Sequence, residues 1–147
     1  LLHPGLNGDY SPTEMSMMVK SHYPDLIAFL ENLPLYFEWE DYLFVHAGVD
    51  LSKKEWRNTS DHDFMWIREP FHIAPNKTGK IIVFGHTITP SLNGDNVTTD
   101  LWIKDHKIGI DGGAVYGGVL HGVLFSSDKL EEDIILENTG YVWDGLV

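Results

Sequence analysis

Three short apolar runs, each followed by a polar residue beside glycine, constrain the fold of this chain more than any other feature. The runs and their end residues are Tyr42–Val45 before His46, Ile81–Phe84 before Gly85 and His86, and residues 108–110 before Asp111. Short apolar runs bounded by Gly are typical of buried β-strands. Side chains at the carboxyl ends of neighbouring strands converge at one edge of a sheet. We therefore predict that these end residues are gathered at a sheet edge.

Helix signals precede these runs. Ser11, Pro12 and Glu14 have the N-cap, N1 and capping-box positions of a helix that should extend to about Val19. Its methionines are assigned to the core as flexible apolar filler: Met15, Met17 and Met18. A second helix should begin near Pro24 and end before Pro34, with one apolar face formed by Leu26, Ile27, Leu30 and Leu33.

Strand signals dominate the rest of the chain. A short helix capped near Ser60 is expected between the first two apolar runs. Further strands are expected over residues 119–125, 134–136 and 141–143, separated by turn-forming segments. Two helices followed by a strand-rich part place the chain in the α+β or layered α/β class.

Composition narrows the function classes. A chain of 147 residues with 43% hydrophobic side chains is expected to form a single domain. It contains no Cys, which excludes thiolate metal sites and favours a cytoplasmic location. The formal charge of -12 and the scattered Lys and Arg disfavour nucleic-acid binding. No apolar run of 18 residues is present, so no membrane span is predicted.

His46 and His86 are the candidate metal ligands. Imidazole is the commonest neutral metal ligand, and a shared sheet edge would bring together two residues that lie 40 positions apart. A lone His at a strand end is more often hydrogen-bonded than metal-bound, so that alternative stays open for each. The other six His residues are interpreted as surface or incidental polar groups, among them His62, His72 and His106.

Four segments carry a family resemblance that covers roughly residues 24 to 125. They are Phe44-Val45-His46-Ala47-Gly48, Trp66-Ile67-Arg68-Glu69, Phe84-Gly85-His86-Thr87, and the glycine-rich segment from Ile110 to Gly118. In order and spacing they resemble the later motifs of bacterial and phage-type phosphoprotein phosphatases, which belong to the calcineurin-like metallophosphoesterase superfamily. The symmetrical diadenosine tetraphosphate hydrolases share these motifs.

The resemblance implies a fold, an activity and a site. The chain would form the second half of an α/β-β-α sandwich, and the intact enzyme would use two divalent metal ions, with Mn expected and Fe, Zn or Ni as alternatives. His46 and His86 match ligands of the second metal, and Arg68 matches the residue that grips the phosphate. Paired metal ions activate water and neutralise a phosphoryl group, and a guanidinium can hold two phosphate oxygens.

Asp111, Gly112 and Tyr116 belong to the same resemblance. Asp111 either orients a ligand His from the second shell or caps its turn. Tyr116 either borders the substrate cleft or packs beneath the loop. Gly112 stands where relatives usually have Thr, which removes a hydroxyl but no ligand.

The N-terminal motifs of that family, GDxHG, GDxxDRG and GNHE, do not occur in this sequence. We therefore expect the chain to be the C-terminal portion of the enzyme and to be inactive by itself. The expected substrate is a phosphoprotein, attacked by metal-activated hydroxide, or alternatively a phosphorylated small molecule such as a dinucleoside polyphosphate. A metal-free interaction module on the same scaffold is the alternative from another class.

Overall fold

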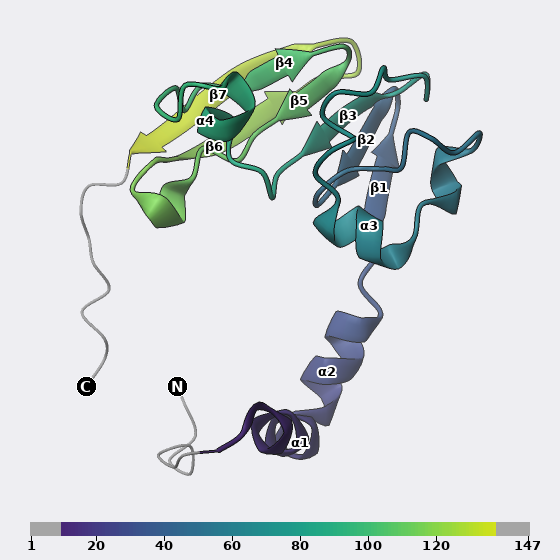
Figure 1. The fold of residues 1–147 in the computed structure, drawn as a ribbon, viewed down its shortest axis with the longest axis vertical. Helices are drawn as coiled ribbons and strands as arrows, with labels where there is room; N and C mark the ends of the chain where they lie inside the picture. The colour runs from purple at the N-terminus through teal and green to yellow at the C-terminus, as the bar shows by residue number, and fades with distance from the viewer. Residues whose placement is uncertain (1–9, 138–147) are drawn as a thin grey trace. The chain divides into compact units, whose positions relative to one another are not determined.

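The computed structural model describes residues 10–137, and the chain divides into two compact units, Leu1–Pro34 and Leu35–Val147 (Figure 1). The first unit contains helices α1 (Pro12–His22) and α2 (Pro24–Glu31). The predicted capping box is confirmed: the Glu14 backbone N–H donates to the Ser11 hydroxyl, and the Ser11 N–H donates to the Glu14 carboxylate. Helix α1 ends three residues later than predicted.

The assignment of the α1 methionines to the core is wrong for this structure. Neither helix buries any residue, and Met15 and Met17 are 46% and 65% exposed. Two short helices enclose too little volume to bury a side chain between them, although Leu26 and Leu30 follow the predicted apolar spacing.

A five-stranded mixed sheet organises the second unit. Its spatial order is β1-β2-β3-β5-β4, formed by β1 (Tyr36–Trp39), β2 (Tyr42–Val45), β3 (Ile81–Phe84), β5 (Lys107–Gly109) and β4 (Trp102–Lys104). The three central strands are parallel, whereas β1 and β4 are antiparallel edge strands. The predicted mixture of helices and strands is thereby confirmed at the level of fold class.

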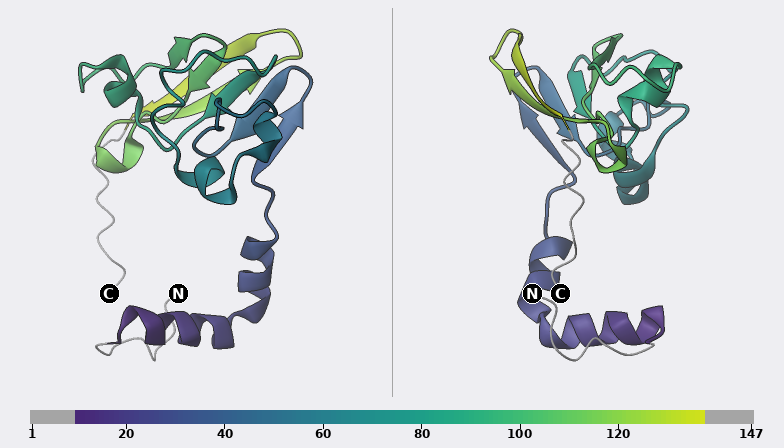
Figure 2. Two further views of the ribbon diagram at one scale, coloured as in Figure 1. Left: turned by 45° about the vertical axis from the view of Figure 1, so that its right-hand side comes forward. Right: turned by 90° about the vertical axis from the view of Figure 1, so that its left-hand side faces the viewer.

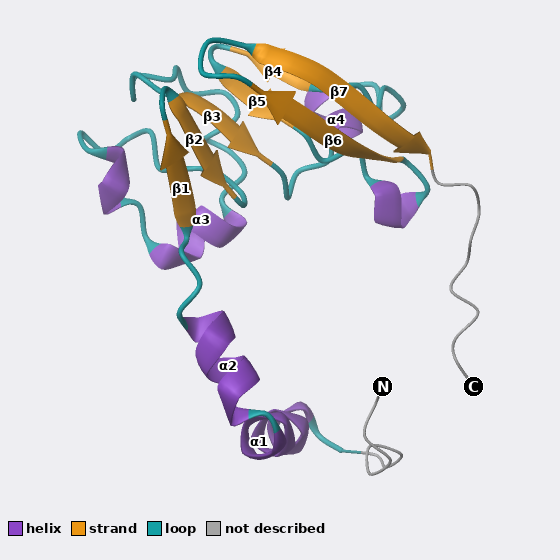
Figure 3. Ribbon diagram, turned by 180° about the vertical axis from the view of Figure 1, so that it is seen from behind, coloured by secondary structure: helices purple, strands orange, loops and turns teal. Residues whose placement is uncertain are grey.

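Each face of this sheet buries a separate core. Alternation in β2 and β3 directs Leu43 and Ile82 to one face, where Trp56, Phe64 and Phe71 cover them. Tyr42 and Val83 belong to the other core, which the hairpin of β6 (Val119–Phe125) and β7 (Leu130–Glu137) covers through the partly buried side chains Phe125 and Leu130. Figures 2 and 3 show the hairpin lying beside the sheet.

Short helical segments make the remaining connections. Helix α3 (Asp61–Trp66) begins at Ser60, whose hydroxyl accepts from the Asp63 N–H as predicted. Helix α4 (Thr89–Asn93) was not predicted, because five residues are too few to show a helical period. Two 3₁₀ turns, Trp56–Asn58 and Ala114–Tyr116, complete the unit.

The strand predictions are largely confirmed, with three differences. Strand β5 begins one residue earlier than predicted, at buried Lys107, and β7 is longer than the predicted 134–136. Strands β1 and β4 were missed because each is short and carries a charged residue. The strand predicted over 141–143 lies outside the described residues. Within residues 10–137, no helix has the length and apolar character needed to cross a membrane.

Candidate functional site

The parallel pairing of β2 with β3 brings His46 and His86 together. Phe44 pairs with Val83, and beyond the strand ends the Gly85 N–H donates to the His46 carbonyl oxygen at 2.9 Å. The centroids of the two imidazole rings lie 5.1 Å apart. His46 is exposed and His86 is half-buried. The predicted placement of both rings at one sheet edge agrees with this geometry, while their role as metal ligands stays a prediction.

His86 has the less ordinary environment of the pair. Its backbone adopts φ 64°, in the left-handed region that few non-glycine residues enter. Its Nε2 atom is buried and has no hydrogen-bond partner among the described residues. The Trp66 ring stands edge-on to the imidazole, with 5.3 Å between centroids. A buried ring nitrogen without a partner is a costly arrangement in a fold.

Burial and nearby positive charge favour the neutral form of the His86 imidazole. Burial lowers its pKa from the usual 6.5, and the electrostatic effects of the neighbouring Arg68 and His46 lower it further. The Asp111 carboxylate and a hydrogen bond to the Trp66 backbone act in the opposite direction. A neutral imidazole presents a lone pair on one ring nitrogen, which is the state that binds metals.

Arg68 lies at the same edge. Its Nη1 donates to the Thr87 hydroxyl at 2.9 Å and to the His86 carbonyl oxygen at 3.4 Å. Thr87 is buried, so it provides a fixed anchor. Within residues 10–137, Arg68 forms no ion pair, with Glu69 or any other acid. The exposed guanidinium therefore keeps N–H donors that have no acceptor among residues 10–137.

Asp111 follows β5 at the third strand end. Its Oδ1 accepts from the Gly113 N–H at 3.1 Å, and its carbonyl oxygen accepts from the Thr89 N–H at 2.7 Å. The carboxylate thus caps its turn, and its effect on His86 is the electrostatic one described above. The sequence left open whether Asp111 caps its turn or orients a ligand His. The turn cap is present, and the carboxylate also raises the pKa of His86.

Tyr116 and Gly112 lie on the glycine-rich loop. Tyr116 is 80% exposed, so the alternative in which it packs beneath the loop is wrong. At Gly112, an added Cβ would lie 2.4 Å from the Val119 carbonyl oxygen. A Thr at this position would therefore collide with β6, and glycine allows the close approach in which the Val119 N–H donates to the Gly112 carbonyl oxygen.

Two histidines were misassigned as surface groups. His72 is 9% exposed, stacks against Phe84, and has a buried Nε2 without a partner in the described part of the chain. Burial lowers its pKa to about 4. His121 is buried as well: Nδ1 lies 2.9 Å from the Asp133 carboxylate, and Nε2 lies 2.7 Å from the Thr99 carbonyl oxygen. Both lie in segments whose burial depends on residues distant in sequence.

The donor set fits part of a metal site. Two imidazoles lie next to one another at a sheet edge, with their planes tilted by 58°, and one has a buried nitrogen without a partner among the described residues. Over residues 10–137, however, no group of three or more His, Cys, Asp or Glu side chains is arranged to hold an ion. No protein-family model matches the chain, and no curated protein matches it either. The geometry of these residues therefore carries the functional argument.

Proposed function

We propose that this chain belongs to a metal-dependent phosphoester hydrolase of the calcineurin-like metallophosphoesterase type and forms the second half of its α/β-β-α sandwich. The observation that carries the proposal is the pairing of His46 with His86, whose buried Nε2 has no partner, at the edge where Arg68 presents free donors. The substrate class is a phosphoprotein, with a dinucleoside polyphosphate as the alternative.

His46 and His86 would hold one divalent ion of a pair, with Mn favoured and Fe, Zn or Ni as alternatives. Imidazole nitrogen suits these ions better than Mg or Ca. When bound, two such ions lower the pKa of a water molecule and neutralise the phosphoryl group. Because the described residues supply only two neutral donors, the proposal requires carboxylate and further ligands from residues beyond this set.

Arg68 would position the phosphate. One of its terminal nitrogens is committed to Thr87, which fixes the side chain, and the rest of the guanidinium is available for phosphate oxygens. Tyr116, exposed on the glycine-rich loop, is proposed as a substrate contact. Asp111 acts indirectly, by holding its turn and raising the pKa of His86 against the effect of burial.

Hydrolysis of p-nitrophenyl phosphate by the full-length protein tests this function. The change Arg68→Ala should lower turnover about a hundredfold while leaving metal content unchanged. Lys104→Ala, an exposed control on β4, should leave both unchanged. Unaltered turnover in Arg68→Ala, or metal loss in that variant, would contradict the assigned role. The chain of residues 1–147 by itself should not hydrolyse this substrate, and Mn-dependent hydrolysis by a preparation of that confirmed mass would also contradict the proposal.

The metal-free interaction module remains the alternative from another class. The specific observation in its favour is that no complete metal-ligand group exists within residues 10–137. A measurement of metal binding by His46 and His86 distinguishes the two functions, because the hydrolase requires it and a metal-free module does not.

A further inference from the structure

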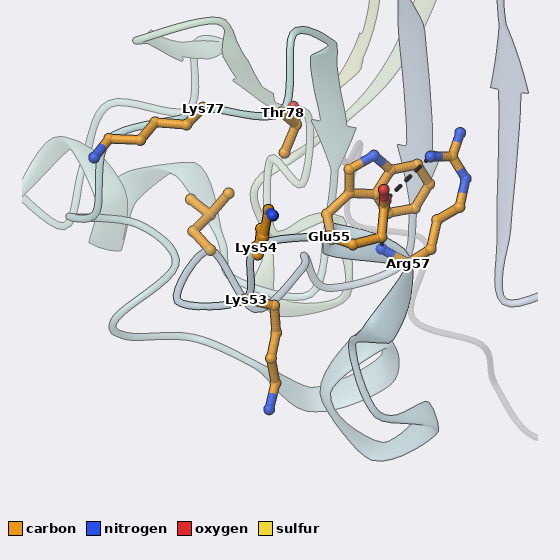
Figure 4. A pocket seen from close by; sticks show the side chains of 8 residues that line it. Lys53, Lys54, Glu55, Arg57, Lys77 and Thr78 are labelled. Carbon is orange, nitrogen blue, oxygen red and sulfur yellow. Dashed lines mark hydrogen bonds and ion pairs between the residues drawn. The ribbon is translucent and has the colours of Figure 1, made fainter.

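A pocket of about 250 Å³ opens on the second unit and shares no residue with the edge that carries His46 and His86. Figure 4 shows its lining side chains, which are Leu51, Lys53, Lys54, Glu55, Trp56, Arg57, Lys77 and Thr78. Four of these eight residues are Lys or Arg, although the whole chain has only 10 such residues against 22 acids. Basic side chains are therefore concentrated in the lining of this pocket, although the protein as a whole is acidic.

The wall around Trp56 is fixed by contacts that leave little freedom. The Arg57 guanidinium lies 4.4 Å from the Trp56 ring centroid, and its Nη2 donates to both carboxylate oxygens of Glu38 at 2.7 and 2.8 Å. Its Nη1 donates to Glu55 at 3.1 Å (Figure 4). Trp56 itself is only 6% exposed. Arg57 thus forms part of the pocket frame and is already neutralised.

The opposite wall is fixed through Asn76. The Thr78 hydroxyl donates to Asn76 Oδ1 at 2.7 Å, and the Asn76 amide donates to the Lys80 carbonyl oxygen at 2.9 Å. Lys77 lies within the segment from Asn76 to Lys80 that these hydrogen bonds hold in place. The backbone on both sides of the pocket is therefore held in place before any ligand arrives, which lowers the ordering cost of binding.

Two lysines keep unbalanced charge at the rim. Lys53 lies 3.7 Å from Asp50, whereas Lys54 and Lys77 form no ion pair in the described part of the chain. In Figure 4, Lys53 and Lys77 extend in different directions from the pocket. Lysine chains have four rotatable bonds, so such ammonium groups can turn towards an anion without backbone movement.

We propose that this pocket binds a phosphorylated side chain of a peptide. A phosphate carries close to two negative charges at pH 7, which matches the two uncommitted ammonium groups of Lys54 and Lys77. Leu51 and Trp56 give the lining an apolar part that suits the carbon atoms of the side chain bearing the phosphate. A long polyanion is disfavoured, because the net charge of -12 would repel it beyond the pocket. The site is independent of the proposed metal edge.

The test is a titration of the ¹⁵N-labelled chain, in buffer containing EDTA, with a five-residue phosphoserine peptide. Backbone amides of residues 51–57 and 77–78 and the Trp56 indole N–H should shift with one dissociation constant. Lys54→Gln/Lys77→Gln should weaken binding at least about tenfold. Lys20→Gln/Lys104→Gln removes the same charge from exposed sites elsewhere and should weaken binding less than about twofold.

Three outcomes of the peptide titrations would overturn the proposal: equal weakening by both double variants, shifts outside these two segments, or equal binding of the unphosphorylated peptide. Tighter binding of a single-stranded oligonucleotide would assign the pocket to nucleic acid and would overturn it as well. An unchanged Trp56 indole resonance in the unliganded double variant establishes that the pocket is still folded. EDTA removes free divalent metal ions, so a metal ion at His46 and His86 cannot contribute to peptide binding. The pocket proposal and the metal-site proposal can therefore be tested independently.

Discussion

His86, in the loop after β3, and His121, inside β6, belong to the same unit, yet their ring nitrogens have opposite environments. His121 has partners at both nitrogens, Asp133 and the Thr99 carbonyl oxygen, and joins the β6–β7 hairpin to the segment before β4. His86 has a buried Nε2 without a partner among the described residues. A satisfied buried imidazole stabilises the fold, whereas an unsatisfied one at a strand end costs stability and is available for a ligand.

The largest effect should come from breaking the satisfied site. His121→Ala should lower the free energy of unfolding by about 2–4 kcal/mol, because it leaves the Asp133 carboxylate without its partner beneath the hairpin. Urea denaturation monitored by circular dichroism measures this. Metal binding at neutral pH should be unchanged. A loss below about 0.5 kcal/mol would mean that the network contributes nothing to the fold.

Gly112→Thr tests how the hairpin approaches the site. The added Cβ would collide with the Val119 carbonyl oxygen, so we expect a loss of about 1–3 kcal/mol in unfolding free energy. Gly122→Thr is the matched control, since a Cβ at Gly122 meets Ile134 at an ordinary 3.6 Å. The same urea measurement applies, and equal losses in both variants would contradict the close approach at Gly112.

His72 extends the comparison to the pH dependence of stability. Its side chain is buried like that of His121, but its Nε2, like that of His86, has no hydrogen-bond partner among the described residues. Above pH 6.5 its ring is neutral in the folded and the unfolded chain. Below that pH the unfolded chain takes up a proton, whereas burial keeps the folded-state pKa at about 4. This group therefore removes stability as pH falls from 6.5 to 4, by up to about 3 kcal/mol, since each unit between the two pKa values corresponds to about 1.4 kcal/mol.

His72→Phe replaces the ring with one that cannot be protonated and should flatten the acid side of the stability profile between pH 6.5 and 4. Unfolding free energies measured across that range provide the check. His62→Phe, at an exposed position in α3, is the control and should leave the profile unchanged. A profile of the same slope in His72→Phe would show that His72 titrates normally in the fold.

The smallest effect on stability should come from His86 itself. Asn tolerates the left-handed backbone at this position, so His86→Asn should change the unfolding free energy by less than about 1 kcal/mol. The same variant should lose metal affinity, because a side-chain amide is a poorer ligand than imidazole. A large destabilisation of His86→Asn with unchanged metal binding would mean that His86 has a structural role like that assigned to His121, and would contradict its role as a ligand.

The sequence predicted those features whose signals are local. The apolar runs of β2 and β3 were found because they are continuous, and parallel pairing then brought His46 and His86 together. Buried Lys107, whose Nζ donates to the carbonyl oxygens of Phe71, His72 and Ala74, gave no local signal because these acceptors lie more than 30 positions away.

His121 was missed for the same reason, since Thr99 and Asp133 are 22 and 12 residues distant. Strand β1 was missed because Glu38 interrupts its apolar pattern, and the Arg57 that binds this carboxylate lies 19 residues further along. The role expected for Arg68 came from motif resemblance alone, and its contact with Thr87 was not predicted, because no periodicity in residues 66–69 indicates where the side chain lies.

Titration of the chain with Zn²⁺, followed by ¹H–¹⁵N spectra of the imidazole rings, tests the central claim most directly. Zn²⁺ is diamagnetic, and each of the eight His residues reports its own tautomer and binding curve. The account predicts that metal-free His86 carries its proton on Nδ1, and that His46 and His86 shift together with one midpoint. His121 should not shift in that range. Independent midpoints for His46 and His86, or shifts of exposed His62 and His106 at lower Zn²⁺ concentrations, would contradict the claim that this sheet edge binds a metal ion.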